Sequence, residues 1–586
     1  MKFTKYLLLI AAISTIACNK IIDLQPVSNS DAASFYSNVT ELNAALTGCY
    51  TGMQKPLTDE WTLAELRSDN VIQGGAASTS TVNRDLSDLD MFFPNVSHQG
   101  IYTYWLNTYY NIRNTNLLLN ALGVNYSETA GTLSYDSIAI PIENLVKRRI
   151  AAEASFIRAY HYFNMVRLYG GVFLVHEPIS PDQAKLVNRT TTDEIYKLII
   201  ADLQNAAANG NTAKFSTTPS TTAAADLGRA NSWSAKALLA KVYLNLNRKT
   251  DAATLLQDII ANSGYSLQSS YANIFSINNE MNSEVLFAIR FKAGGLGLGS
   301  LLPNLFAPSN SGSAIVNGDG KGYMWPSHEM NNAYANFSLT GASVKKDSLR
   351  VVLTNLPTNT NILVGMSLTG TQLAQNTTVA AISGNILTLS LPAVATSTNS
   401  SINVATDLRR GLSIGYFANY SVRYPAKLIS NPTFVNDAEN DWMVIRYADV
   451  LLMLAEAQGN TSASIDLINQ TRARARLPLL LSSAINTTAL FEKALADERR
   501  FEFAFENQRW FDLQRYNTTF TTITVEQTMK DHFTTMYPLH YTSYPNPKLT
   551  LAEMQAFVVP NRMLLPIPQR EIDNNTQIVI LQNPGY

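Results

Sequence analysis

Pairs of amphipathic segments recur along the chain, and they restrict its fold more than any other feature. Ser232–Leu246 and Asp251–Ala261 are separated only by residues 247–250. Apolar residues recur in both segments at spacings of three and four, which is typical of helices. Small residues such as Ala237 and Ala252 let two helices approach closely, as they do in tetratricopeptide repeats. Ordinary helical hairpins would show the same spacing, so both interpretations stay open.

The pairing recurs at two other places. Asp441–Gln458 precedes Ser462–Arg476, and Ile142–Tyr169 precedes Thr192–Asn209. The intervals between the pairs are irregular, which argues against a regular solenoid. The sequence therefore predicts a mainly α fold in which helix pairs are embedded in a larger body.

One segment departs from the helical pattern. Between Val351 and Thr406 no residue is Asp, Glu, Lys, Arg or His, although 15% of the whole chain is charged. Apolar and β-branched residues alternate there with Thr, Ser and Asn, and Gly384-Asn385 precedes a run typical of a return strand. We predict a small all-β insertion at 351–406. Its uncharged faces fit either contact with a neutral partner or a sandwich with a polar outer face.

The charge balance excludes one class of function. Lys and Arg number 44, Asp and Glu number 45, and the formal net charge is −1. A nucleic-acid-binding protein needs an excess of positive charge to neutralise phosphates. We therefore expect no nucleic-acid partner.

The N-terminus is typical of an exported protein. Lys2 and Lys5 precede the apolar run Tyr6–Ala17, which is shorter than the about 20 residues that span a bilayer. Cys18 follows directly, where a bacterial lipoprotein carries its acylated cysteine. We predict a signal peptide at 1–17, a lipidated tether at 18–30 and a helical domain at 31–586 that contains the insertion. A plain signal peptide, cut nearby, is the alternative.

The cysteine content limits the chemistry. With Cys18 acylated, Cys49 has no partner, because the chain has only two cysteines. The fold cannot depend on a disulfide or on a cysteine-rich zinc site. None of the six histidines has the close spacing of a metal-ligand motif, so we predict neither a metal site nor a cofactor.

Two patterns resemble catalytic motifs. Gly411–Gly415 fits G-x-S-x-G, but a nucleophile elbow follows a buried strand, and here a polar, charged stretch precedes it. Glu498 and Glu502 share a helix face and would suit a glycosidase pair. Arginines lie among them at helical spacing, which favours a structural salt-bridge network instead. We predict that the chain is not an enzyme, with a secreted all-helical glycosidase as an alternative.

The aromatic content suggests a binding function. The chain has 27 Tyr, 23 Phe and 6 Trp. Flat aromatic faces stack on the C–H faces of sugar rings, while amide and charged side chains bond the hydroxyls. Composition alone does not decide this, since most aromatic residues are core residues.

Several segments, in order along the chain, resemble the RagB/SusD family of outer-membrane lipoproteins. They cover nearly the whole chain except the insertion, and they read CNKIIDLQ (18–25), ALTGCY (45–50), RAYHYFNMVRLYGGV (158–172), RYADVLLMLAEA (446–457), ADERRFEFAFENQRWFDLQR (496–515), LLPIPQREIDNN (564–575) and QNPGY (582–586).

This resemblance implies a SusD-like fold, with tetratricopeptide-like helix pairs supporting a loop-rich ligand-binding half. It further implies a non-catalytic lipoprotein, lipid-anchored and exposed on the outer membrane. Such a protein captures a glycan and delivers it to a SusC-like TonB-dependent transporter. Some members of the family take peptides, so a peptide ligand is an alternative. A scaffold that binds only protein is a further one, and it would use helical grooves.

The resemblance also suggests where a ligand would bind. The family's site residues lie in the first third of the chain and just past its middle. The matching positions here are Asp69, Asn70, Tyr323 and Trp325. Trp325 lies in a segment rich in glycine and proline, which predicts a loop that either displays the indole or folds it onto the core. Asp69 and Asn70 would equally suit tying down a loop.

Overall fold

The computed structural model describes residues 35–586 apart from 75–80, 139, 141, 214, 216–226, 335, 355–361, 363, 365, 375–376, 406, 545–547 and 576. The expected signal peptide, the tether at 18–30 and the lipidation site Cys18 lie outside the described residues.

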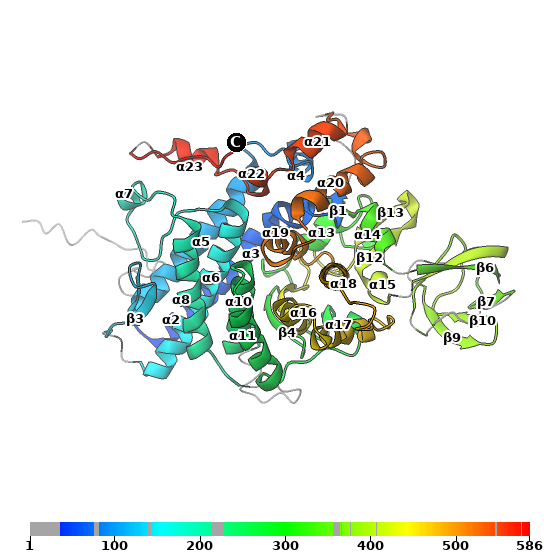
Figure 1. Cartoon of the computed structure of the whole chain (residues 1–586), viewed down its shortest axis with the longest axis horizontal. Coiled ribbons are helices and arrows are strands. Elements are labelled where there is room, and N and C mark those ends of the chain that lie inside the picture. The colour runs from blue at the N-terminus through cyan, green and yellow to red at the C-terminus, as the bar shows by residue number, and fades with distance from the viewer. Residues whose placement is uncertain are drawn as a thin grey trace, which may run out of the picture.

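Eight helices form a continuous array in which each helix packs against the next along the chain. They run side by side from the left of Figure 1 to its centre. Their bounds are α5 Gln99–Ala121, α6 Asn144–Tyr169, α8 Thr192–Asn209, α10 Ser232–Asn245, α11 Lys249–Asn262, α16 Tyr447–Gln458, α17 Ser462–Arg474 and α18 Thr488–Glu502. The three predicted pairs are confirmed as α6/α8, α10/α11 and α16/α17. Nearly every residue of α10 is buried, and this helix contacts α8 as well as α11.

Local signals set the ends of these helices. Thr191 caps α8 by accepting a hydrogen bond from the Glu194 N–H, and Asn231 caps α10 in a capping box. Helix α6 ends at Gly170, whose φ of 73° is the left-handed conformation that favours glycine.

For one helix, the start predicted from the sequence is too early. The first residues of the segment 441–458 form strand β14, Trp442–Arg446, and helix α16 starts only at Tyr447. Strand β14 pairs with β4, Val285–Ile289, and every residue of both strands is buried. A short apolar run buried on all sides has no periodicity that separates strand from helix.

The remaining elements surround the array and make up the loop-rich half. The helices are α2 Val39–Gly52, α3 Gln54–Leu63, α4 Thr81–Asp90, α7 Pro181–Ala184, α12 Tyr271–Ile274, α13 Leu302–Phe306, α14 His328–Ala333, α15 Arg409–Ser413, α19 Arg509–Thr519, α20 Val525–Met536, α21 Leu551–Phe557, α22 Pro560–Met563 and α23 Gln569–Asp573. Three antiparallel ribbons pair β1 Val71–Gln73 with β5 Met324–Pro326, β2 Val124–Ser127 with β3 Thr132–Tyr135, and β12 Ile414–Phe417 with β13 Val422–Pro425.

A six-stranded antiparallel sheet projects from the right of the body in Figure 1. Its strand order is β8-β11-β6-β7-β10-β9. The strands are β6 Asn336–Val344, β7 Arg350–Leu353, β8 Leu368–Thr369, β9 Val379–Ser383, β10 Ile386–Leu389 and β11 Ser397–Ala405. Its core, from Leu339 to Val404, is separate from the main core. We call these residues, 336–405, the β insertion.

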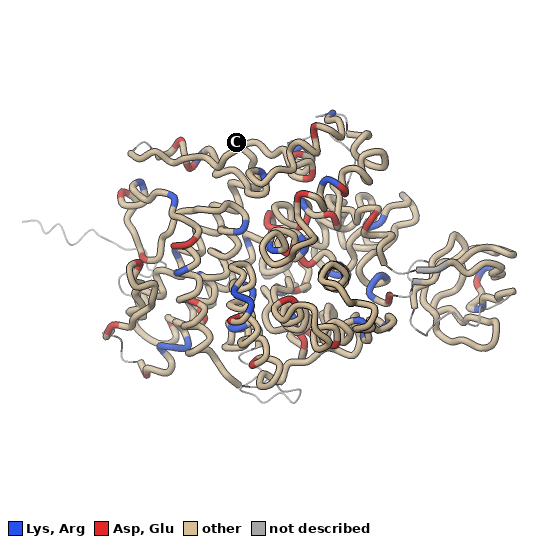
Figure 2. The backbone as a smooth tube through the Cα atoms, in the orientation of Figure 1, with Lys and Arg blue, Asp and Glu red and all other residues tan. Residues whose placement is uncertain are grey.

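The β insertion begins earlier than the predicted 351–406. Strand β6, which pairs with both β7 and β11, precedes Val351. The sequence criterion was the absence of charge, and the β6–β7 connection carries Lys345, Lys346 and Asp347. Figure 2 accordingly shows a nearly uncharged unit with a few charged positions. At the predicted turn, Gly384 adopts φ 57° between β9 and β10.

The separate core predicts that the β insertion can be removed as a unit. Replacing 336–405 by a short Gly/Ser linker should leave the far-UV helical signal and the solubility intact, since loop length costs little entropy. Replacing only 351–406 should cause aggregation, because β6 would lose both partner strands and expose Leu339, Ala342 and Val344. Loss of helix in the first variant would contradict this prediction.

Candidate functional site

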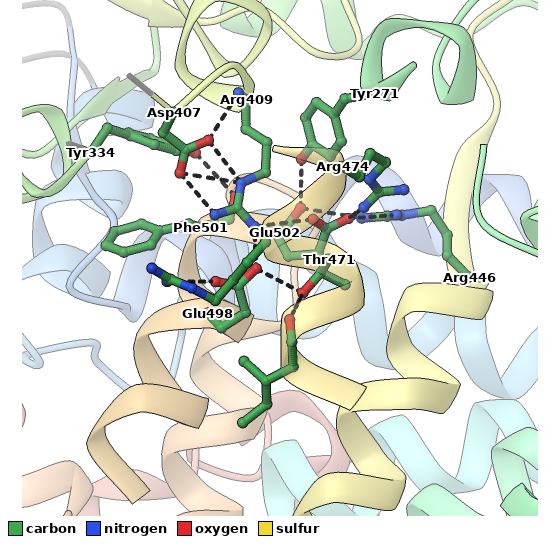
Figure 3. Close-up of polar contacts among 12 residues, drawn as sticks. Tyr271, Tyr334, Asp407, Arg409, Arg446, Thr471, Arg474, Glu498, Phe501 and Glu502 are labelled. Carbon is green, nitrogen blue, oxygen red and sulfur yellow. Dashed lines mark hydrogen bonds and ion pairs between the residues drawn. The ribbon is translucent and has the colours of Figure 1, made fainter. Parts of the chain in front are cut away.

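Glu498 and Glu502, the candidate glycosidase pair, lie in a buried cluster of ion pairs at the C-terminal end of α18. Arg409 Nη1 is 2.6 Å from Glu498 Oε1 and 3.2 Å from Glu502 Oε2. Arg446 Nη1 is 3.0 Å from Glu502 Oε1, and Arg474 pairs with the same carboxylate. Figure 3 shows these side chains converging on α18. We call them, with Asp407 and Glu284, the α18 ion cluster.

The electrostatics of this cluster do not suit acid–base catalysis. Burial by itself would raise the pKa of Glu502, but Arg474, Arg446 and Arg409 outweigh it and hold that pKa far below its usual range. A glycosidase acid needs the opposite, a carboxyl group that stays protonated near neutral pH. Both carboxylates are also fully buried. The structure therefore supports the salt-bridge interpretation and not the glycosidase alternative.

The α18 ion cluster joins parts of the fold that are distant in sequence. Arg446 at the end of β14 also binds Glu284, which precedes β4, at 2.6 Å. Arg409 binds Asp407 through two parallel hydrogen bonds of 2.9 and 2.8 Å, just after the β insertion. The helical array, the β4–β14 ribbon and the exit of the insertion thus meet at one point.

The G-x-S-x-G pattern at 411–415 is not a nucleophile elbow. Ser413 ends helix α15 and precedes strand β12, which is the reverse of the strand–turn–helix order. A Cβ at Gly411 would lie 2.0 Å from the Ser367 hydroxyl of the β insertion. A Cβ at Gly415 would lie 2.3 Å from the ring of Tyr424 on the paired strand. Both glycines serve close packing.

Asp69 and Asn70 face the protein interior, with exposed fractions of 3% and 0%. Asp69 accepts two hydrogen bonds from Arg509, at 2.7 and 2.9 Å. Asn70 donates to Glu65 at 3.1 Å and accepts from Arg500 at 2.9 Å. These contacts match the loop-tying interpretation, because they hold the chain before β1 against α18 and α19.

Trp325 lies on β5, which pairs with the strand β1 that follows this loop, and Tyr323 directly precedes β5. Ile72 pairs with Trp325 across the β1–β5 ribbon, and the Gly74 N–H donates to the Tyr323 carbonyl at 3.0 Å. Ser327 donates through its N–H to the Asn70 carbonyl and through its hydroxyl to the Asp69 carbonyl, each at 2.8 Å. The structure therefore brings the two predicted regions together.

The indole of Trp325 is half-buried and lies across Gly74. A Cβ at Gly74 would come within 2.5 Å of Trp325 Cδ1, so only glycine leaves room for this ring. The indole Nε1 has no hydrogen-bond partner among the residues that the structure describes. Tyr323 is half-buried as well. These two rings remain the candidate ligand contacts.

Sequence reasoning missed the neighbouring β12–β13 ribbon. Strand β13 lies against β5, and the ribbon carries Tyr416, which is 36% exposed, and Arg423. The alternation of an exposed aromatic residue with buried ones in a short hairpin was the available signal. This hairpin overlaps the G-x-S-x-G pattern, and the sequence there was interpreted only as a possible catalytic motif.

The described part of the chain offers neither a metal-binding group nor a membrane-spanning helix. No three His, Cys, Asp or Glu side chains group there as metal ligands do. None of its helices combines the length and the apolar character needed to cross a bilayer.

Comparison with known proteins agrees with this architecture. A family model described as "SusD family" matches residues 283–586, and one described as "Starch-binding associating with outer membrane" matches residues 22–244. SusD-like protein P25 of Formosa agariphila is 24% identical over 616 residues, which cover 98% of this chain and 97% of the relative.

Solved structures share the fold. Surface glycan-binding protein A from Bacteroides thetaiotaomicron, in complex with laminarihexaose, has a TM-score of 0.62 at 16% identity, covering 93% of this chain and 99% of that one. Surface glycan-binding protein A from Bacteroides fluxus has a TM-score of 0.64 at 18% identity, with the same coverages. The chain belongs to the SusD family, and the expected mainly α, SusD-like fold is confirmed. The prediction that the chain is not an enzyme agrees with this assignment.

The α18 ion cluster predicts a large stability effect for Glu502→Gln. Its removal leaves three buried arginines without their shared carboxylate, which should lower the free energy of unfolding by about 3–5 kcal/mol in a urea titration. Asp497→Asn, which breaks the exposed pair with Lys493, is the control and should cost less than about 1 kcal/mol.

The effect should depend on pH in a defined direction. Because the pKa of Glu502 is lower in the folded chain than its ordinary 4.5, its contribution is complete above that value and is lost as the pH falls below it. The difference between wild type and Glu502→Gln should therefore shrink in acid. Equal stability of the two proteins at pH 7 would contradict a stabilising role.

Proposed function

We propose that this chain is a non-catalytic lipoprotein that captures a glycan at the cell surface and delivers it to a SusC-like TonB-dependent transporter. Membership of the SusD family supports the proposal, as does the laminarihexaose bound in the structure of one relative. The observation that carries it in this chain is Trp325, held half-buried on a short ribbon of the loop-rich half.

The β1–β5 ribbon has the chemistry that sugar binding needs. The half-buried Trp325 indole offers an apolar face to the C–H groups of a pyranose ring. Tyr323, which directly precedes β5, adds a second aromatic ring two positions away. In this proposal Asp69 and Asn70 act indirectly, since their buried contacts to Arg509 and Arg500 fix the position of the ribbon.

Anchoring and partner form the second part of the proposal. Cys18 follows the apolar run at the position of a lipobox cysteine, so acylation there would hold the chain on the outer membrane. The family model that matches residues 22–244 is described as associating with the outer membrane. A transporter partner then follows from the function, because a glycan held at the surface has to cross that membrane.

Trp325→Ala tests the ligand site. With laminarihexaose and other oligosaccharides as probes, the variant should lose about 1–3 kcal/mol of binding free energy, which is the scale of one aromatic hot-spot contact. The thermal midpoint should move by no more than a few degrees. Tyr110→Ala, which removes an exposed ring from α5, is the matched control and should bind as wild type does. A sharp fall in midpoint with unchanged affinity would instead make Trp325 a core residue.

Cys18→Ser tests the anchor. The substituted chain should be unacylated and appear in the soluble fraction, because anchoring depends on the acyl chains. The fractionation belongs in a strain without the transporter, where that partner cannot retain the protein. Retention of the serine variant in the outer-membrane fraction of such a strain would refute the lipoprotein assignment.

A further inference from the structure

A cavity of about 450 Å³ lies where the β insertion meets the β12–β13 ribbon. This volume is within the range of about 300–1,000 Å³ that is usual for small-molecule sites. The insertion contributes neutral polar groups, including Thr369, Thr371 and Asn403. The body contributes Arg410, Tyr416 and Arg423.

Among the described residues that line this cavity, the charged ones are Arg410 and Arg423, and none carries a carboxylate. Arg410 is only 7% exposed. Its Nη2 donates to the Asn331 amide oxygen at 3.0 Å, and its Nε has no hydrogen-bond partner among the described residues. The guanidinium of Arg423 lies 5.3 Å from the centre of the Tyr416 ring.

Burial and the positive charge of Arg423 lower the pKa of Arg410 to about 10, so the surroundings of Arg410 disfavour its charged form. Burial lowers the pKa of Arg423 as well. The neighbouring Arg409 is in the opposite situation, since it binds Asp407, Glu498 and Glu502. The part of the insertion that lines the cavity, within residues 367–403, does not supply the missing charge, because it has no acidic residue.

A cavity lined by two guanidinium groups and no carboxylate is suited to bind an anion. The rest of the lining fits a sugar, since hydroxyl and amide groups can bond ring hydroxyls and Tyr416 offers an aromatic face. One strand connects the cavity with the candidate glycan site, because β13, which carries Arg423, contacts β5, the strand of Trp325.

We propose that this cavity binds an anionic group on a saccharide, either the carboxylate of a uronic acid or a sulfate ester. This inference rests on the proposed glycan capture and narrows the ligand to acidic glycans. Arg410 and Arg423 bind the anionic group, and the neutral wall of the insertion contacts the sugar ring.

The test compares sugars that differ only in charge. Glucuronate, galacturonate and glucose 6-sulfate are titrated into the purified chain by calorimetry or ligand-observed NMR, against glucose and galactose. The acidic sugars should bind at least about tenfold more tightly, as is usual for hydrogen bonds to a charged group. Comparing the uronates with the sulfate ester distinguishes the two anions.

The variant Arg423→Gln should remove that preference and leave the neutral sugars unaffected. Arg423 is chosen because it is only half-buried, so its replacement leaves the core intact. Arg423→Lys keeps the positive charge but lacks the paired N–H donors of the guanidinium. It should therefore retain part of the preference that Arg423→Gln loses. Arg476→Gln is the matched control, because Arg476 is exposed and donates to the insertion at the Val364 carbonyl, outside the cavity lining.

The outcomes separate this inference from the proposed function. If neutral oligosaccharides bind through Trp325 but acidic sugars show no dependence on Arg423, the anion site is refuted and glycan capture stands. If acidic sugars bind through Arg423 but Trp325→Ala affects no oligosaccharide, the anion site stands and the site proposed at Trp325 fails. A glutamate-rich peptide that binds as tightly as the sugar acids would overturn the saccharide assignment.

Discussion

The structure depends on the α18 ion cluster, in which one carboxylate, Glu502, is shared by three arginines from different segments. Taking these charges out of water is costly, and only good geometry and mutual hydrogen bonding offset that cost. Arg446 ends β14, Arg474 ends α17, and Arg409 follows the β insertion. Because all three must be in place together, the cluster fixes how the helical array, the central ribbon and the insertion meet.

The helix pairs were predictable because apolar residues recur along them at the spacings of three and four that are typical of helices. The start of α16 was not, because Trp442–Arg446 is buried on every side and has no period to distinguish strand from helix. The start of the β insertion was missed for another reason. The segment was identified by its lack of charged residues. Strand β6 lies before the charged β6–β7 connection, so this criterion left it out.

The candidate site was predictable only in part. Resemblance placed Asp69, Asn70, Tyr323 and Trp325 in two regions, and the structure joins these regions through β1 and β5. The buried state of Asp69 follows from Arg509, 440 positions away, which no local pattern reveals. The cavity beside Tyr416 was beyond sequence reasoning as well, because its two walls come from separate units that meet only in the folded chain.

The attachment of the β insertion has a consequence for the evolution of the chain. On its entry side, the Tyr334 hydroxyl donates to the Phe501 carbonyl at 3.1 Å, and on its exit side Asp407 binds Arg409. Figure 3 shows Tyr334 and Asp407 next to each other. Arg409 in turn binds Glu498 and Glu502, so residues outside the insertion fasten both of its ends to α18. Selection can exchange this unit for another, and with it one wall of the adjoining cavity, while the rest of the molecule keeps its architecture.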